Sequence, residues 1–142
     1  MPKTPPIRYL TVAAVRAIHE EVLAAHGGMP GLREPALLES AVAAPQASDR
    51  GKTLLNDPVE IAAAYLYYLC SNHPFADGNK RVALAACLIF LEANGRLPDP
   101  DLPGKDSDAW ETLVLDIAGS RINRAGATRQ LKRLLGHHAR RK

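Results

Sequence analysis

The sequence is poor in cysteine and has no long hydrophobic run, and these absences exclude several classes of protein. Its two cysteines, Cys70 and Cys87, both lie in runs rich in alanine and leucine. They have the character of small buried hydrophobic residues and predict neither a disulfide framework nor a CxxC metal site. The longest apolar run, residues 82–91, is about half the length of a membrane-spanning helix. Residues 1–6 also lack the apolar stretch of a signal peptide, so we expect a cytoplasmic protein with no membrane partner.

Aromatic residues are scarce as well, at 5% of the chain, although 46% of the residues are hydrophobic. Much of this apolar content is alanine, which is the best helix former and lets neighbouring backbones approach closely. The composition therefore favours a core of closely packed helices. A chain of 142 residues can bury a sizeable core of its own. We expect residues 1–142 to form a single domain.

Acidic side chains are absent from the C-terminal segment, residues 121–142, which carries eight lysines and arginines. The preceding 120 residues hold ten cations and 15 acids, so they sum to −5, and the net charge of +3 hides an acidic body with a basic C-terminal helix. Such a helix can bind nucleic-acid phosphates or an acidic protein. Cations also suit the C-terminal end of a helix dipole. Because no recognition-helix layout accompanies the charges, we disfavour nucleic acid as a partner.

Helical periodicity dominates the chain, and strand signals are nearly absent. Thr11 and Asp57 are predicted helix caps, and Pro45 is predicted to stop the second helix. The predicted helices cover about 12–26, 35–44, 59–70 and 80–93, a segment around 110–117 and a last segment around 131–135. The third and fourth are apolar on nearly every side, as expected of helices in the centre of a domain. The predicted fold class is all-α, a compact six-helix bundle in which two central buried helices flank a polar turn.

That turn, His73 to Arg81, concentrates groups suited to phosphate chemistry in nine residues, HPFADGNKR. A helix N-terminus binds phosphates through its unpaired N–H groups and its dipole. An imidazole suits proton abstraction near neutral pH, and a carboxylate such as that of Asp77 suits Mg²⁺. Gly78 lets an anion approach the backbone, and Asn79 adds an amide donor. The structural alternative is that Asp77 or Asn79 only caps the following helix.

The pattern H-x-F-x-D-G-N-K-R resembles the signature of the Fic/Doc superfamily, and this version is similar to its Doc (death-on-curing) branch. Residues 27–34, 37–46 and 82–95 are also similar to the matching segments of Doc-like proteins. The resemblance covers roughly residues 7–135. It implies a Fic/Doc-type bundle in which the polar turn is the active site.

The resemblance implies a role for each matching residue. His73 would take the proton from a target hydroxyl, and Asp77 would place Mg²⁺ on the phosphates of ATP. Phe75 would anchor the turn in the core. The nucleotide-binding residues would be Gly78, Asn79, Lys80 and Arg81.

Within this resemblance, the residue at position 80 indicates whether the protein transfers AMP or phosphate. AMP-transferring Fic proteins have glycine at this position, whereas lysine in the Doc branch implies that ATP binds in the reverse direction, with its γ-phosphate facing the acceptor. Leu84 stands where many AMP-transferring members have a second arginine, which also disfavours AMP transfer. We therefore expect a toxin-like protein kinase that phosphorylates a Ser or Thr hydroxyl of a translation factor, with elongation factor Tu as the leading candidate.

Two alternatives stay open. One is Fic-type transfer of AMP or another nucleotide to a protein hydroxyl. The other is a module that binds nucleic acid or an antitoxin through the basic C-terminal helix. No inhibitory S/T-x-x-x-E/G-N helix is evident near either end, so the resemblance implies restraint by a separate cognate antitoxin.

Residues outside the turn receive weaker interpretations. Residues 46–56 form a predicted exposed loop, either a flap over the site or an ordinary connector. Arg33 and Arg50 could help hold nucleotide or target, but we favour their interpretation as solvated surface charges. His19 and His26 lie on the first predicted helix without a partner at a suitable spacing, and the sequence assigns them no role.

Overall fold

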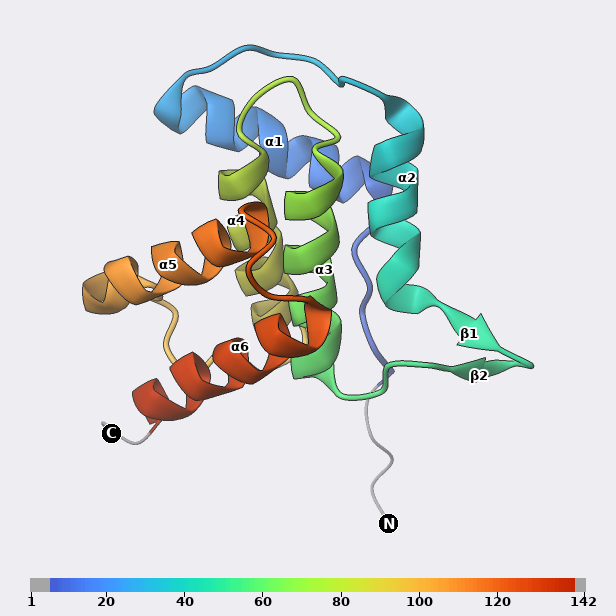
Figure 1. The fold of residues 1–142 in the computed structure, drawn as a ribbon, viewed down its shortest axis with the longest axis vertical. Helices are drawn as coiled ribbons and strands as arrows, with labels where there is room; N and C mark the ends of the chain where they lie inside the picture. The colour runs from blue at the N-terminus through green and yellow to red at the C-terminus, as the bar shows by residue number, and fades with distance from the viewer. Residues whose placement is uncertain (1–5, 140–142) are drawn as a thin grey trace.

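The computed structural model describes residues 6–139, apart from the side chains of residues 105 and 137–139, and within this range the protein is a bundle of six α-helices (Figure 1). The helices are α1 (Val12–His26), α2 (Pro35–Ala43), α3 (Pro58–Asn72), α4 (Asn79–Ala93), α5 (Ser107–Ala118) and α6 (Arg124–Ala139). Short 3-10 turns lie at Ala44–Gln46 and Gly104–Asp106. The prediction of an all-α, six-helix fold is confirmed. None of these helices is both long enough and apolar enough to span a bilayer.

Two helix starts follow the capping rules that the sequence predicts. The hydroxyl oxygen of Thr11 accepts a hydrogen bond from the backbone N–H of Ala14 at 3.0 Å. A carboxylate oxygen of Asp57 accepts one from the N–H of Val59, also at 3.0 Å, and Pro58 occupies the first helical position. Each bond satisfies a backbone donor that has no partner inside its helix.

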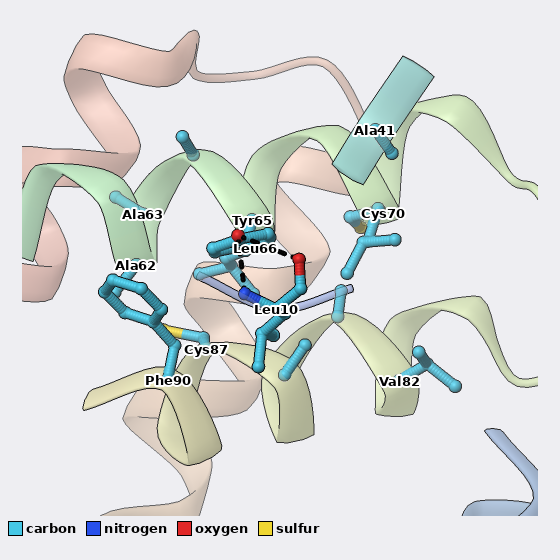
Figure 2. Close-up of a cluster of buried hydrophobic side chains, with 14 of the residues drawn as sticks. Leu10, Ala41, Ala62, Ala63, Tyr65, Leu66, Cys70, Val82, Cys87 and Phe90 are labelled. Carbon is cyan, nitrogen blue, oxygen red and sulfur yellow. Dashed lines mark hydrogen bonds between the residues drawn. The ribbon is translucent and has the colours of Figure 1, made fainter. Parts of the chain in front are cut away.

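Helices α3 and α4 form the centre of the bundle, and α2, α5 and α6 pack around α3 (Figure 1). Alanines are fully buried on both central helices, which pack closely against each other. These alanines are Ala62, Ala63, Ala64, Ala83 and Ala86. Figure 2 shows two of them, Ala62 and Ala63 of α3. Trp110 of α5 and Leu131 of α6 are also fully buried and form part of the same core. The two central helices are therefore buried as predicted, and they hold the turn that joins them in a fixed place.

Both cysteines are free and buried, as their apolar surroundings predict. Burial raises the pKa of the Cys87 thiol to about 12 and also raises the pKa of the Cys70 thiol above its usual value. Thiols of this kind are poor nucleophiles because little thiolate forms near neutral pH. They serve as packing residues.

Tyr65 ties the segment before α1 to the central helix. Its hydroxyl oxygen accepts a hydrogen bond from the N–H of Leu10 at 2.9 Å and donates to the Leu10 carbonyl at 3.5 Å (Figure 2). Tyr65 is fully buried, and burial raises the pKa of its hydroxyl to about 12. The phenol therefore stays protonated and can serve as donor and acceptor at once.

The segment of residues 46–56 differs from its prediction as a plain loop. It contains an antiparallel hairpin of β1 (Ser48–Asp49) and β2 (Lys52–Thr53). Arg50 and Gly51 form its tip with φ values of 53° and 81°, which is the left-handed pair of a tight hairpin turn. The hairpin precedes α3, whereas the polar turn follows it, so about 22 Å of helix separates them (Figure 1). This position fits the connector interpretation and leaves the turn uncovered by the hairpin.

We expect Tyr65→Phe to lower the free energy of unfolding by about 1–3 kcal/mol, because the buried N–H of Leu10 would lose its partner. Urea denaturation would measure the change. The matched control is Tyr67→Phe on the same helix, where the half-buried hydroxyl makes no hydrogen bond within the described part of the chain. The control should change stability by less than about 0.5 kcal/mol. Equal losses in the two variants would contradict the role given to the Tyr65 hydroxyl.

Candidate functional site

The predicted active-site turn joins the end of α3 to the start of α4, and its backbone is left-handed at both ends. His73 follows α3 with φ 49° and ψ 56°, and Gly78 precedes α4 with φ 82° and ψ 10°. For glycine this conformation is easy, but for histidine it costs roughly 1–2 kcal/mol. Surrounding contacts must hold His73 in place. His73 is exposed to solvent at the α3 end of the turn.

Arg33, from the α1–α2 connection, supplies one of these contacts. Its Nε donates to the carbonyl of His73 at 2.9 Å, and its Nη2 donates to the carbonyl of Asn72 at 3.1 Å. The guanidinium thus binds two carbonyls at the C-terminus of α3, where a cation also suits the helix dipole. Arg33 is exposed, as its interpretation as a surface charge predicts, but its donors also hold the backbone that carries His73.

The rest of this connection pairs with the turn as a short backbone ladder. Leu32 and Phe75 form an antiparallel bridge. The N–H of Arg33 donates to the carbonyl of Pro74 at 2.8 Å, and the N–H of Ala76 donates to the carbonyl of Gly31 at 3.0 Å. The Phe75 side chain is 2% exposed, so its predicted role as a buried anchor is confirmed.

The Asn79 side chain closes the turn from within. Its amide oxygen accepts from the N–H of Phe75, and its amide nitrogen donates to the carbonyl of the same residue, both at 2.9 Å. The alternative that Asp77 or Asn79 caps α4 is wrong, because Gly78 is the N-cap residue and no side chain makes a capping hydrogen bond there. The side-chain amide is thus occupied within the turn, and only the backbone N–H of Asn79, in the first turn of α4, fits the predicted anion-binding role.

Asp77 lies exposed beside the N-terminus of α4, and two backbone donors orient its carboxylate. The N–H of Gly78 donates to Oδ1 at 2.9 Å, and the N–H of Met29 donates to Oδ2 at 3.2 Å. Gly28 allows this approach, because a Cβ atom there would lie only 2.8 Å from Asp77 Oδ2. Gly28 also has a φ of +125°, which side chains rarely adopt. The α1–α2 connection therefore fits closely around the carboxylate predicted to hold a metal ion.

An open groove of about 820 Å³ runs from the turn between α1, α4 and α5. Asp77, Gly78, Asn79, Lys80 and Arg81 line one end of it. Lys80 and Arg81 are exposed, and the side chains farther along are mainly apolar, including Leu84 and Leu88. The structure thus brings the predicted nucleotide and metal residues together on one surface. His73 stands at the other end of the turn and does not line this groove.

His19, to which the sequence assigns no role, packs directly against the turn. His19 is 5% exposed, its ring stacks on Phe75 with centroids 3.9 Å apart, and its Nε2 lies 2.9 Å from the Asp77 carbonyl oxygen. A signal was present in the sequence, because His19 lies on the apolar face of its helix between Val15 and Val22. A polar group on such a face must find a hydrogen-bond partner.

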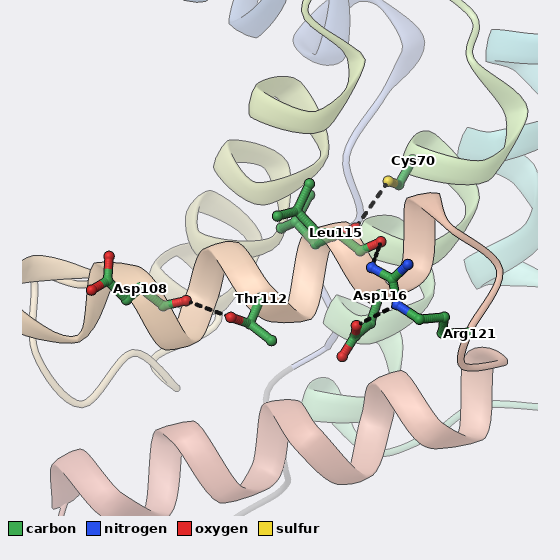
Figure 3. Close-up of polar contacts among 7 residues, drawn as sticks. Cys70, Asp108, Thr112, Leu115, Asp116 and Arg121 are labelled. Atoms are coloured by element: carbon green, nitrogen blue, oxygen red, sulfur yellow. Dashed lines mark hydrogen bonds and ion pairs between the residues drawn. The ribbon is translucent and has the colours of Figure 1, made fainter.

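Two cations of the C-terminal segment are paired with acids of the body. Arg121 binds the Asp116 carboxylate at 2.8 Å and donates to the Leu115 carbonyl at 2.9 Å, at the end of α5 (Figure 3). Lys132 of α6 lies 3.3 Å from the Asp57 carboxylate. Arg121 thus places a cation at the C-terminal end of α5, which suits the helix dipole, whereas Lys132 in the middle of α6 forms an ion pair with the N-cap residue of α3. Residues 140–142, which include three of its cations, lie outside the described residues.

We expect Gly28→Ala to destabilise the protein more than Gly31→Ala. Both glycines have a positive φ, +125° and +105°, so each alanine adds backbone strain of about 1–3 kcal/mol. Only the Cβ at position 28 would meet Asp77, since a Cβ at position 31 would meet nothing within 4 Å. A double-mutant cycle measured by urea denaturation isolates this contact. In an Asp77→Ala background the extra cost of Gly28→Ala should fall but not vanish, because a Cβ there would also lie 3.0 Å from Leu23 Cδ2. An undiminished extra cost would refute the contact with Asp77.

Comparison with known proteins agrees with this geometry. The sequence model of the Fic/DOC family matches residues 9–91, which include the whole turn and the α1–α2 connection. The chain is 29% identical over 130 residues to "Protein kinase doc" of Escherichia phage P1, covering 92% of this chain and 98% of that protein. It is 40% identical over 94 residues to "Toxin Doc" of Mycolicibacterium smegmatis, covering 66% of this chain and 70% of that protein. The chain therefore belongs to the Fic/DOC family and, as its motif predicts, to the Doc branch.

Proposed function

We propose that the protein is a Doc-type toxin, a protein kinase that transfers the γ-phosphate of ATP to a Ser or Thr hydroxyl of a translation factor. Elongation factor Tu is the first candidate target. The observation that carries the proposal is Lys80, which is exposed in the first turn of α4 on the same groove as Asp77 and Arg81. The name and nearly complete coverage of the phage P1 relative also support a kinase.

The proposed reaction is an in-line phosphoryl transfer. The oxygen of the acceptor hydroxyl forms a bond to the γ-phosphorus while the bond between that phosphorus and the β-phosphate oxygen breaks, and ADP leaves. The hydroxyl proton passes to the imidazole of His73. General base catalysis of this kind contributes about 10²- to 10⁴-fold to a rate. The exposed position of His73 and the fixed carbonyl behind it suit this role.

The start of α4 would bind the phosphates. Its first N–H groups and its dipole favour anions, and Gly78 leaves the backbone open to them. Arg81 offers a planar fork to phosphate oxygens, whereas Lys80 offers a compact charge. We propose that the Lys80 side chain also occupies the space that a diphosphate would need in the AMP-transferring orientation.

Asp77 fits the needs of a magnesium ion bound with ATP. Mg²⁺ is usually held by one or two carboxylates together with phosphate oxygens and water. Within the described residues no three His, Cys, Asp or Glu side chains gather as a metal cluster, and a magnesium–nucleotide site does not require one. Each Asp77 oxygen accepts one N–H and keeps further acceptor capacity. When bound, the ion would neutralise phosphate charge.

A toxin of this kind requires restraint, and we propose that a cognate antitoxin provides it in the cytoplasm. The relative from Mycolicibacterium smegmatis is itself named a toxin. The expected partner is a segment that folds on binding, which allows a short chain to cover a large surface. An acidic segment would complement the basic C-terminal residues 121–142.

His73→Ala should slow phosphorylation of elongation factor Tu by about 10²- to 10⁴-fold, because the general base is lost. Mass spectrometry after incubation with ATP and Mg²⁺ would measure the product. Nucleotide affinity and unfolding free energy should stay near those of the unmodified protein. The control Ser71→Ala, exposed two residues earlier, should keep full activity. An unchanged rate in His73→Ala would remove His73 from the mechanism, and an unmodified factor with the unaltered enzyme would exclude this target.

Lys80→Gly should lower phosphate transfer and allow AMP transfer, because it opens the space for the reverse nucleotide orientation. The mass of the modified target distinguishes the two products. Lys80→Met is the matched control, since it removes the charge but retains a long side chain. It should transfer phosphate slowly and no AMP. If the unmodified protein itself adds AMP, the alternative of Fic-type nucleotide transfer replaces the kinase proposal.

A further inference from the structure

We infer that His19 is a positioning residue that orients the Asp77–Gly78 peptide group at the start of α4 by holding the Asp77 carbonyl. The kinetic part of this inference rests on the proposed kinase function, whereas its structural part stands without it. His19 lies on α1, far from the turn in sequence, and its side chain is buried. Its partner is 58 residues away.

The contact defines the state of the imidazole. A carbonyl oxygen can only accept a hydrogen bond, so the Nε2 atom, 2.9 Å from the Asp77 oxygen, must carry a hydrogen. The ring is also stacked on Phe75, with an interplanar angle of 11°. The stacking fixes the plane of the ring, and the hydrogen bond fixes its rotation within that plane. His19 is therefore held as an Nε2–H donor aimed at one peptide group.

The peptide group between Asp77 and Gly78 links the His19 hydrogen bond to the orientation of the site. The carbonyl of Asp77 and the N–H of Gly78 belong to the same trans peptide group, so they point in opposite directions. When His19 holds the carbonyl toward α1, the N–H must point away from α1. That N–H donates to Asp77 Oδ1 and adjoins the first turn of α4. His19 thereby orients both a backbone donor and the carboxylate proposed to hold magnesium.

The turn is thus held from two sides at the same residue. His19 binds the main-chain oxygen of Asp77, and the N–H of Met29 binds its side-chain oxygen. Gly78 also lies close to the ring, because a Cβ atom there would be 3.8 Å from His19 Cδ2. A purely apolar residue at position 19 could fill the space against Phe75 but could not hold the carbonyl. This difference separates a positioning role from simple packing.

Two substitutions separate the hydrogen bond from the stacking. His19→Phe keeps a ring against Phe75 but removes the donor, whereas His19→Gln removes the ring and keeps an amide N–H near the position of Nε2. We expect the Kd for MgADP, measured by calorimetry, to rise about tenfold in His19→Phe, as for the loss of one hydrogen bond. The KM for ATP should rise with it, while kcat changes less than threefold. In His19→Gln both constants should stay within threefold of the unmodified values.

Val15→Ala serves as the control for stability, because Val15 is fully buried one turn earlier on α1. It should lower the unfolding free energy at least as much as His19→Phe and leave the Kd for MgADP unchanged. If nucleotide affinity falls equally in Val15→Ala, or equally in His19→Gln and His19→Phe, the positioning role is refuted.

Nuclear magnetic resonance tests the structural part without any nucleotide. Imidazole ¹⁵N shifts of the unmodified protein should show the hydrogen of His19 on Nε2. The amide resonance of Gly78 should move in His19→Phe and return toward its original position in His19→Gln. A hydrogen on Nδ1 alone would overturn the inference even in an active kinase. A protein that binds no nucleotide but shows these shifts would refute the proposed function and retain the orienting role of His19.

Discussion

The site depends on the backbone ladder between the α1–α2 connection and the polar turn. A turn between two buried helices must satisfy its own donors and acceptors, and this one adopts left-handed backbone at His73 and Gly78. Local sequence does not supply enough partners. Residues 31–33 supply them by pairing with residues 74–76, and the Arg33 guanidinium completes the set at the end of α3. The geometry of the turn is therefore a long-range property of the fold.

The charged side chains differ in what they do for this architecture. The basic segment, residues 121–142, carries eight cations and no acid. Its described ion pairs lie at exposed or half-exposed positions, where such pairs contribute little to stability. Arg121 closes the end of α5, and Lys132 pairs with the residue that caps α3. Lys80 and Arg81, in the acidic body, are the cations beside the predicted phosphate site. The position of a cation relative to the predicted phosphate site therefore matters more for the proposed function than the number of cations in a segment.

The sequence predicts the helices well because their signals are local. The caps at Thr11 and Asp57 act within one turn, and the reactive groups of the site are contiguous from His73 to Arg81. The residues that hold the site in place are distant from it in the sequence. Arg33 and His19 act on main-chain carbonyls 39 to 58 residues away, and a main-chain partner leaves no trace in residue type. The hairpin was missed for a related reason, since two-residue strands carry no periodicity.

The turn divides its residues between two tasks, and this division suits phosphoryl transfer. Phe75 and Asn79 face inward and fix the backbone, while His73, Lys80 and Arg81 remain exposed. Catalysis of phosphoryl transfer relies mainly on positioning and on fixed charges, so a rigid backbone has direct value. A side chain that is packed or hydrogen-bonded within the protein is not free to move with a substrate. Because Arg33 and His19 bind main-chain carbonyls of the turn and its flank, they leave the side chains of His73, Lys80 and Arg81 exposed.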